Sequence, residues 1–311
     1  MRDFSVRVAP LLVLPLVHCV LVLFADPFNF FGLPVNITSE TVRTKYAVPT
    51  NPAIYRFTRY RANPKPDILL GDSRMAILTP ELIKEQTDLD VANLAIPGGS
   101  FETTLDAYWL ASEWTKLRSV TIGVSFDMYN DFRIGSEIAT VRSLNENPML
   151  YFTNRNVIDA SIEAYKSRLG FAVSDRFQLS RLNDRQIWEE GRLFYSNSLR
   201  SWRNPLRYKA RLRDIAQHCR ANATQLRFVI LPQHDEASRL IVQNGLSAEY
   251  VAMKSDLAGI APLVDLSAPN ELTNDRKYFT DMLHFGPEKD FRVIARLWPE
   301  LAKKPTAVPL P

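Results

Sequence analysis

Five short, nearly continuous apolar runs alternate with helical segments along most of this chain, and this alternation is the strongest constraint on its fold. Runs without polar alternation are typical of strands that are covered on both faces. Strands separated by helices form a parallel sheet. The sequence therefore predicts an α/β fold with three layers, in which helices cover a five-stranded parallel sheet. The predicted strands are residues 67–70, 91–94, 119–124, 226–231 and 262–266.

Helical patterns fill the gaps between these runs. Residues 102–117 place Leu105, Trp109 and Leu110 at helical spacing, which predicts one covering helix. Residues 80–86 and 290–298 predict two more.

The gap between the third and fourth runs is too long for an ordinary crossover, which indicates an insertion at about residues 133–213. This insertion carries 13 arginines and two lysines against eight acidic residues. Three interpretations stay open for it: a lid over a site, a contact for lipid headgroups, or an ordinary solvated face.

Residues 8–25 form an apolar stretch that Arg2 and Arg7 precede and Asp26 follows. About 20 apolar residues are needed to cross a bilayer, and basic flanks favour the cytoplasm. The stretch therefore predicts a transmembrane signal anchor. A cleaved signal peptide and a buried core helix are the alternatives.

With that anchor, residues 1–7 would be cytoplasmic, and the rest would lie on the periplasmic side of an inner or plasma membrane. Residues 26–66 are rich in proline, asparagine and threonine and predict a stalk or wrapping segment. The main domain would span residues 67–300 and include the insertion, and residues 301–311 would form a tail.

Two groups of residues carry candidate chemistry. Gly71, Asp72 and Ser73 directly follow the first apolar run, where a tight turn would present the serine at the carboxyl end of a strand. Near the C-terminus, Asp281 stands three residues before His284, a spacing that lets a carboxylate orient an imidazole.

These motifs resemble the Ser-Gly-Asn-His hydrolases, also called the GDSL family, over about residues 67–290. The resemblance implies a flavodoxin-like three-layer fold and a catalytic triad of Ser73, His284 and Asp281. The family's second motif has a glycine after the second strand, which matches Gly98 or Gly99.

The third motif departs from the family pattern of Gly-x-Asn-Asp, because Gly123 is followed by Asp127 and Asn130. The resemblance implies an oxyanion hole formed by Ser73, Gly98 and Asn130, with Asp127 as the second choice for the side-chain donor.

The closer likeness is to membrane-anchored members that accompany membrane-bound O-acyltransferases in polysaccharide modification. It implies an esterase or O-acyltransferase that acts on an O-acylated cell-envelope or exported glycan. A non-catalytic accessory or carbohydrate-binding subunit with the same fold is the alternative. The expected partners are the ester substrate, a membrane and a membrane-bound O-acyltransferase.

Four further residues are candidate substrate contacts: Arg74, Gly99, Asp127 and His234. Arg74 would alternatively pair with Asp72. With two cysteines and four histidines, the sequence predicts no metal site, and no cofactor motif is visible. A net charge of +4 gives no reason to expect nucleic acid as a partner.

Overall fold

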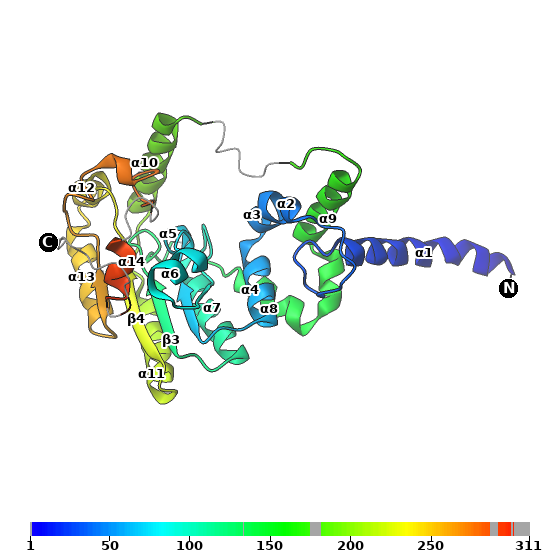
Figure 1. Ribbon diagram of the computed structural model, residues 1–311, viewed down its shortest axis with the longest axis horizontal. Coiled ribbons are helices and arrows are strands. Elements are labelled where there is room, and N and C mark those ends of the chain that lie inside the picture. Colours follow the sequence, from blue (N-terminus) through cyan, green and yellow to red (C-terminus); the bar gives the residue numbers. More distant parts are fainter. Residues whose placement is uncertain (1, 133, 175–181, 287–291, 300, 302–311) are drawn as a thin grey trace. The chain divides into compact units, whose positions relative to one another are not determined.

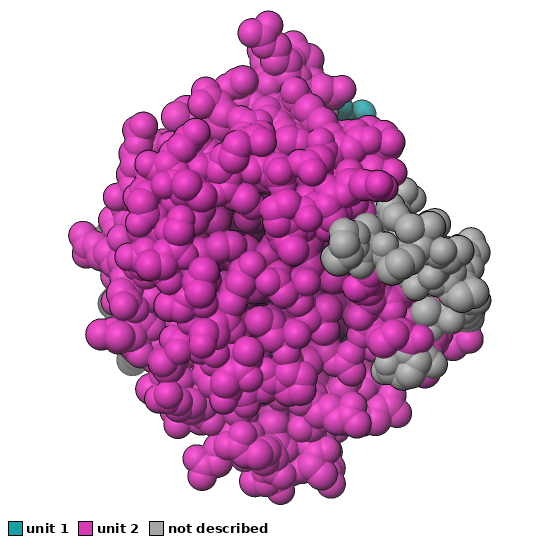
Figure 2. Space-filling view, turned by 90° about the vertical axis from the view of Figure 1, so that its left-hand side faces the viewer, with its two compact units in different colours: residues 1–62, 139–178 teal, residues 63–138, 179–311 magenta. Residues whose placement is uncertain are grey.

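The computed structural model describes residues 2–132, 134–174, 182–286, 292–299 and 301, with side chains from residue 13 onward except at residue 292 (Figure 1). The chain forms two compact units. Unit 1 contains Met1–Ala62 and Ala139–Gln178, and unit 2 contains Asn63–Ile138 and Leu179–Pro311, which is magenta in Figure 2. The insertion predicted at residues 133–213 is therefore divided between the units.

Unit 2 is built on a five-stranded sheet in which every pairing is parallel, with strand order β2-β1-β3-β4-β5. Leu70 at the end of β1 lies beside Ile122 of β3, and Ile122 lies beside Phe228 of β4. The predicted parallel sheet is confirmed. Its strands are β1 (Asp67–Leu70), β2 (Ala92–Asn93), β3 (Ser119–Gly123), β4 (Gln225–Ile230) and β5 (Leu263–Asp265).

Helices cover both faces of this sheet, which confirms the three layers. The chain reverses direction across the sheet after β2, and right-handed crossovers place helices before and after such a reversal on opposite faces. Helix α7 packs against α11 on one face, and α6 packs against α14 on the other. These helices are α6 (Pro80–Thr87), α7 (Phe101–Trp114), α11 (Leu206–Ala221) and α14 (Arg292–Leu297).

Local signals set the ends of several helices. The hydroxyls of Thr79 and Ser100 accept from the first turns of α6 and α7. Asn183 and Gln186 form a capping box at the start of α10. The remaining elements of unit 2 are α5 (Ser73–Ala76), α10 (Asp184–Arg200), α12 (Asp235–Gln243), α13 (Ser247–Ala258) and the 3₁₀ turn η4 (Arg276–Tyr278).

Unit 1 is helical in its described part. Val22 and Ala25 at the end of α1 are buried, and His18 Nε2 lies 2.8 Å from Phe152 O. Its elements are α1 (Arg2–Ala25), α2 (Glu40–Val42), the π-helical turn η1 (Arg43–Ala47), α3 (Val48–Thr50), α4 (Pro52–Ala62), α8 (Ile138–Glu146), the 3₁₀ turn η2 (Pro148–Thr153) and α9 (Arg155–Arg168).

The structure contradicts the prediction that residues 8–25 form a transmembrane anchor. Within the part of the chain that it describes, it contains no helix with enough length and apolar character for a membrane crossing. The same finding overturns the predicted single-pass location in a membrane. Part of the apolar stretch is used inside unit 1 instead, where Ala25 packs in one cluster with Val42 and Ala164.

Candidate active site

Ser73 lies in a tight turn at the carboxyl end of β1. Gly71 has a φ of +147°, and a Cβ there would come within 2.7 Å of Met75 Cγ, so only glycine lets the turn close onto α5. Asp72 caps α5, because its Oδ1 accepts from Arg74 N at 2.9 Å. The N–H of Ser73 has no hydrogen-bond partner among the described residues, as is usual at a helix start.

His284 joins this serine to a carboxylate. Ser73 Oγ lies 2.8 Å from His284 Nε2, and His284 Nδ1 lies 2.7 Å from Asp281 Oδ2. A carboxylate can only accept a hydrogen bond, so His284 carries its proton on Nδ1. The unprotonated Nε2 can then accept a hydrogen bond from the Ser73 hydroxyl. The structure therefore brings together the three side chains that the sequence predicted as a group.

Asp281 is held by its own loop. Its Oδ1 accepts from the backbone N–H groups of Leu283 at 2.8 Å and His284 at 3.0 Å. Burial by itself would raise the pKa of this carboxyl, but the bonds from His284 and the two backbone groups outweigh burial. The pKa of Asp281 consequently lies below its ordinary value, and the group is a carboxylate at neutral pH.

A buried ion pair lies beside the nucleophile turn. The Arg74 guanidinium bonds Asp127, and both residues are almost fully buried. Ser125 donates to Asp72 Oδ2 at 2.7 Å, which ties β3's following loop to the same turn. Burial would lower the pKa of Arg74, but Asp127 and Asp72 together raise it, so the charge persists. Arg74 thus pairs inside the fold with Asp127 and, at 3.7 Å, with Asp72, which is the alternative that the sequence offered to a substrate contact. Asp127 was predicted as a substrate contact and is used in the same ion pair.

The loop after β2 is joined to the turn as well. Ile96 N donates to Gly71 O at 2.9 Å, and the Asn93 amide donates to Met75 O at 2.7 Å. Gly98 has a φ of +74° and is exposed, whereas Gly99 N donates to Ile96 O. The N–H of Gly99 is therefore used within the loop.

Asn130 is fully buried, and its side chain has partners of its own. Its Oδ1 accepts from Phe132 N at 3.0 Å and Arg203 N at 2.9 Å, and its Nδ2 donates to Ser198 O at 3.4 Å. The carboxamide thus holds the third loop against the segment that follows α10. These contacts give no support to its predicted part in an oxyanion hole.

His234 caps the start of α12, where its Nδ1 accepts from Glu236 N at 3.2 Å. Its ring lies edge-on between Trp188 and Phe279, with centroids 4.9 and 5.6 Å away. Burial lowers the pKa of His234 below its ordinary value. The His234 ring thus packs between α10 and the loop that contains Phe279. These contacts give no support to its predicted role in substrate binding.

Helix α10 was missed by the sequence analysis as part of this site. A Cβ on Gly191 would lie 3.0 Å from Asp281 Cβ, so the helix backbone packs directly against the acid. One turn further on, Tyr195 is fully buried and interacts electrostatically with the ion pair described above. Buried residues recur at 188, 195 and 199, and this helical spacing is the signal that could have placed α10 on the domain.

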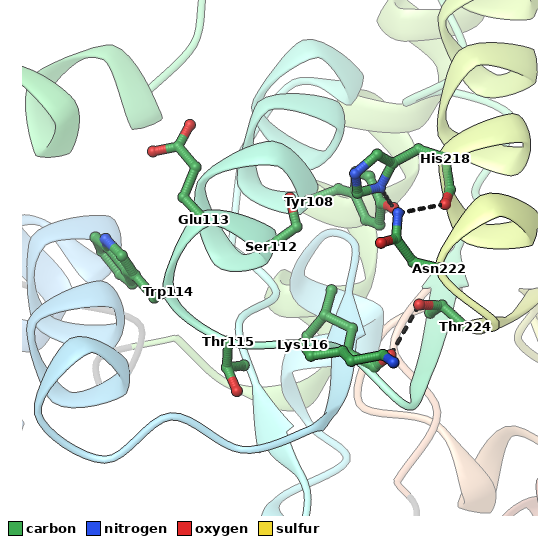
Figure 3. A pocket seen from close by; sticks show the side chains of 10 residues that line it. Tyr108, Ser112, Glu113, Trp114, Thr115, Lys116, His218, Asn222 and Thr224 are labelled. Carbon is green, nitrogen blue, oxygen red and sulfur yellow. Dashed lines mark hydrogen bonds between the residues drawn. The ribbon is translucent and has the colours of Figure 1, made fainter.

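A hollow of about 360 Å³ lies away from these residues, at the amino edge of the sheet, and Figure 3 shows its lining side chains. Tyr108 Oη lies 2.6 Å from His218 Nδ1 and 3.2 Å from Cys219 Sγ. Asn222 donates from its amide to His218 O at 2.9 Å. Within the described residues, no group of three or more His, Cys, Asp and Glu side chains is placed to hold a metal ion.

No protein-family model matches this sequence, and no curated protein matches it. Two solved structures are similar over 79% and 80% of the chain, each with 12% identity and a TM-score of 0.40. One is a Bacteroides fragilis protein named as a "putative acylhydrolase", of which 94% is covered. The other is a Streptococcus pneumonia protein named as a "putative platelet activating factor", of which 92% is covered. This likeness is too weak to assign an activity to the chain.

Proposed function

We propose that this chain is a serine-dependent acyl-transfer enzyme that acts on esters. The observation that carries the proposal is the pair of bonds at 2.8 and 2.7 Å that joins Ser73, His284 and Asp281 in that order. A serine hydroxyl is a weak nucleophile until a neighbouring base takes its proton. A carboxylate that fixes the tautomer of this base completes the arrangement.

In the proposed reaction, Ser73 Oγ attacks the carbonyl carbon of an ester while its proton moves to His284 Nε2. The tetrahedral intermediate collapses, the alcohol leaves with that proton, and the acyl group remains on Ser73. Water or a second alcohol then attacks the acyl carbon and gives its proton to His284. When this second intermediate collapses, His284 returns the proton to Ser73 Oγ, and the acyl group leaves with the acceptor. Water gives hydrolysis, and a sugar hydroxyl gives transfer.

The oxyanion would be stabilised by the backbone N–H groups of Ser73 and Gly98. Loss of one such donor typically costs about 3 kcal/mol of transition-state stabilisation. Because the carboxamide of Asn130 holds a loop, we propose a hole of two backbone donors without it.

The family resemblance of the motifs motivates an O-acylated glycan as the substrate and a partner acyltransferase as a source of acyl groups.

Fluorophosphonate labelling of the full chain tests the proposal. We expect one adduct, located on Ser73 by mass spectrometry and absent in Ser73→Ala. Labelling should slow strongly in His284→Gln. Ser112→Ala is the matched control, because Ser112 lies in the amino-edge hollow. No adduct on folded protein, or an equal rate in Ser73→Ala, would refute the proposal.

The second candidate is a non-catalytic, glycan-binding subunit, and the engaged carboxamide of Asn130 favours it. This candidate predicts that Ser73→Ala binds an acylated oligosaccharide as tightly as the wild type, and that neither protein cleaves an aryl acetate. Turnover of the aryl ester by the wild type alone would decide for the enzyme.

A further inference from the structure

Unit 1 contains a pocket of about 320 Å³ outside the candidate active site. Four of its lining residues come from one face of α4, at positions 55, 58, 59 and 62. The others come from η1 and from the loop after α1. The lining residues are Asn29, Arg43, Tyr55, Thr58, Arg59 and Ala62.

Arg43 brings a poorly compensated charge to this pocket. Its side chain is only 19% exposed, and its Nε is buried with no hydrogen-bond partner among the described residues. Within that part of the chain, its acidic partner is Glu40, at 3.7 Å and with a side chain that is 64% exposed. A buried charge is normally paired and hydrogen-bonded, so this guanidinium has capacity left for an anion.

Arg59 adds a second guanidinium. Its Nη1 donates to Tyr55 Oη at 2.6 Å, which leaves the tyrosine hydroxyl free to donate its own proton. No carboxylate is among the residues that line the pocket. The buried Asp26 of the same unit is used elsewhere, since it accepts from Phe30 N and from the Tyr151 hydroxyl.

The backbone at Arg43 is also unusual. Arg43 begins η1, a π-helical turn between the short helices α2 and α3. Such turns are rare and occur frequently at functional sites. The conformation of the backbone and the unfilled bonding capacity of the side chain therefore coincide at one residue.

We infer that this pocket binds a doubly charged tetrahedral oxyanion, phosphate or sulfate. Two guanidinium groups match its charge, and guanidinium forks suit such oxygens geometrically. The hydroxyls of Tyr55 and Thr58 and the amide of Asn29 add neutral donors. The volume exceeds that of a free ion, so the anion would be one group of a small molecule. The inference is independent of the function proposed for unit 2.

Calorimetric titration of the full chain with inorganic phosphate and with sulfate, at constant ionic strength, tests the inference. We expect saturable binding that weakens at least tenfold in Arg43→Gln and in Arg59→Gln. Arg59 is exposed, so its variant should fold even where Arg43→Gln does not. Arg155→Gln is the matched control, because Arg155 is 93% exposed and outside the pocket.

For Glu40→Gln we expect the opposite change in the affinity for phosphate. Removal of the carboxylate that competes for Arg43 should tighten phosphate binding several-fold, whereas damage to the fold would weaken it. Stronger binding of phosphate than of sulfate would indicate that the natural ligand carries a phosphate group. Stronger binding of sulfate would indicate a sulfate group. The inference is overturned if neither anion binds, if chloride competes equally, or if both arginine variants keep the wild-type affinity.

Discussion

Two histidines form hydrogen-bonded chains at opposite edges of the same sheet. At the carboxyl edge, His284 lies between Ser73 and Asp281, at 2.8 and 2.7 Å. At the amino edge, His218 lies 2.6 Å from Tyr108, whose hydroxyl is 3.2 Å from Cys219. Each chain thus contains a hydroxyl or thiol group that could act as a nucleophile.

The difference between them is the carboxylate. Burial raises the pKa of Tyr108 and of Cys219, so both groups at the amino edge stay neutral. A neutral tyrosine hydroxyl and a neutral thiol provide no negative charge to stabilise an imidazolium, and Cys219 does not ionise to a nucleophilic thiolate. At the carboxyl edge, the pKa of Asp281 is lowered, and its negative charge faces His284 Nδ1. A histidine beside a hydroxyl is common, and the carboxylate behind His284 is the feature on which the proposed catalysis depends.

The largest effect is expected for Asp281→Asn. The amide leaves the geometry in place but removes the charge and disturbs the tautomer of His284, so ester turnover should fall about 10⁴-fold. Tyr108→Phe makes the corresponding change at the amino edge and should leave turnover unchanged. Steady-state rates on an aryl acetate check both variants, and equal losses in the two would break the comparison.

Two ion pairs at the ends of β1 give the next comparison. Arg74→Met would strand the buried charge of Asp127, which should cost roughly 3–5 kcal/mol of unfolding free energy. Arg118→Met at the amino edge should cost less, although Asp67 is also buried, because the Arg118 side chain is 65% exposed and Ser119 Oγ still donates to Asp67 Oδ1 at 2.6 Å. Urea unfolding measures both, and similar losses would contradict the expectation that the pair with two buried side chains contributes more stability.

Gly191→Ala separates positioning from stability. Alanine should favour α10 by about 1 kcal/mol through helix propensity, yet its Cβ would press on Asp281. Displacement of the acid should lower kcat roughly ten- to hundredfold with little change in KM.

Asn197→Ala on the exposed side of α10 provides the control, because it raises helix propensity without that contact. In an Asp281→Asn background, the Gly191→Ala effect should nearly vanish, since the two changes act on one bond. Full additivity would assign Gly191 a purely structural role.

The smallest effect concerns pH. Burial lowers the folded-state pKa of His234, so the unfolded chain binds a proton where the folded chain does not. The free energy of unfolding should therefore decrease as the pH falls from about 6.5 through that folded pKa. His234→Asn keeps a capping side chain and should flatten this slope. Chemical unfolding at several pH values provides the test.

Much of the unit 2 fold could be predicted from the sequence, because its signals are local. Continuous apolar runs become strands wherever helices can cover them, and each run became a strand of the parallel sheet. The bonds from Asp281 to its own loop span three residues or fewer, so spacing alone predicted that pairing. The glycine at position 71 predicted the turn that presents Ser73.

Only the tertiary structure decided which distant segments meet. Ser73 and His284 are 211 positions apart, and packing of the sheet sets their distance. The contact of α10 with Asp281 and the partners of Asn130 depend on how the insertion folds back, which no local pattern encodes. An apolar run likewise does not say what will cover it, and at the end of α1 the cover is a cluster within unit 1. Residue patterns determine local conformation because they act over a few bonds, whereas burial depends on the whole packed chain.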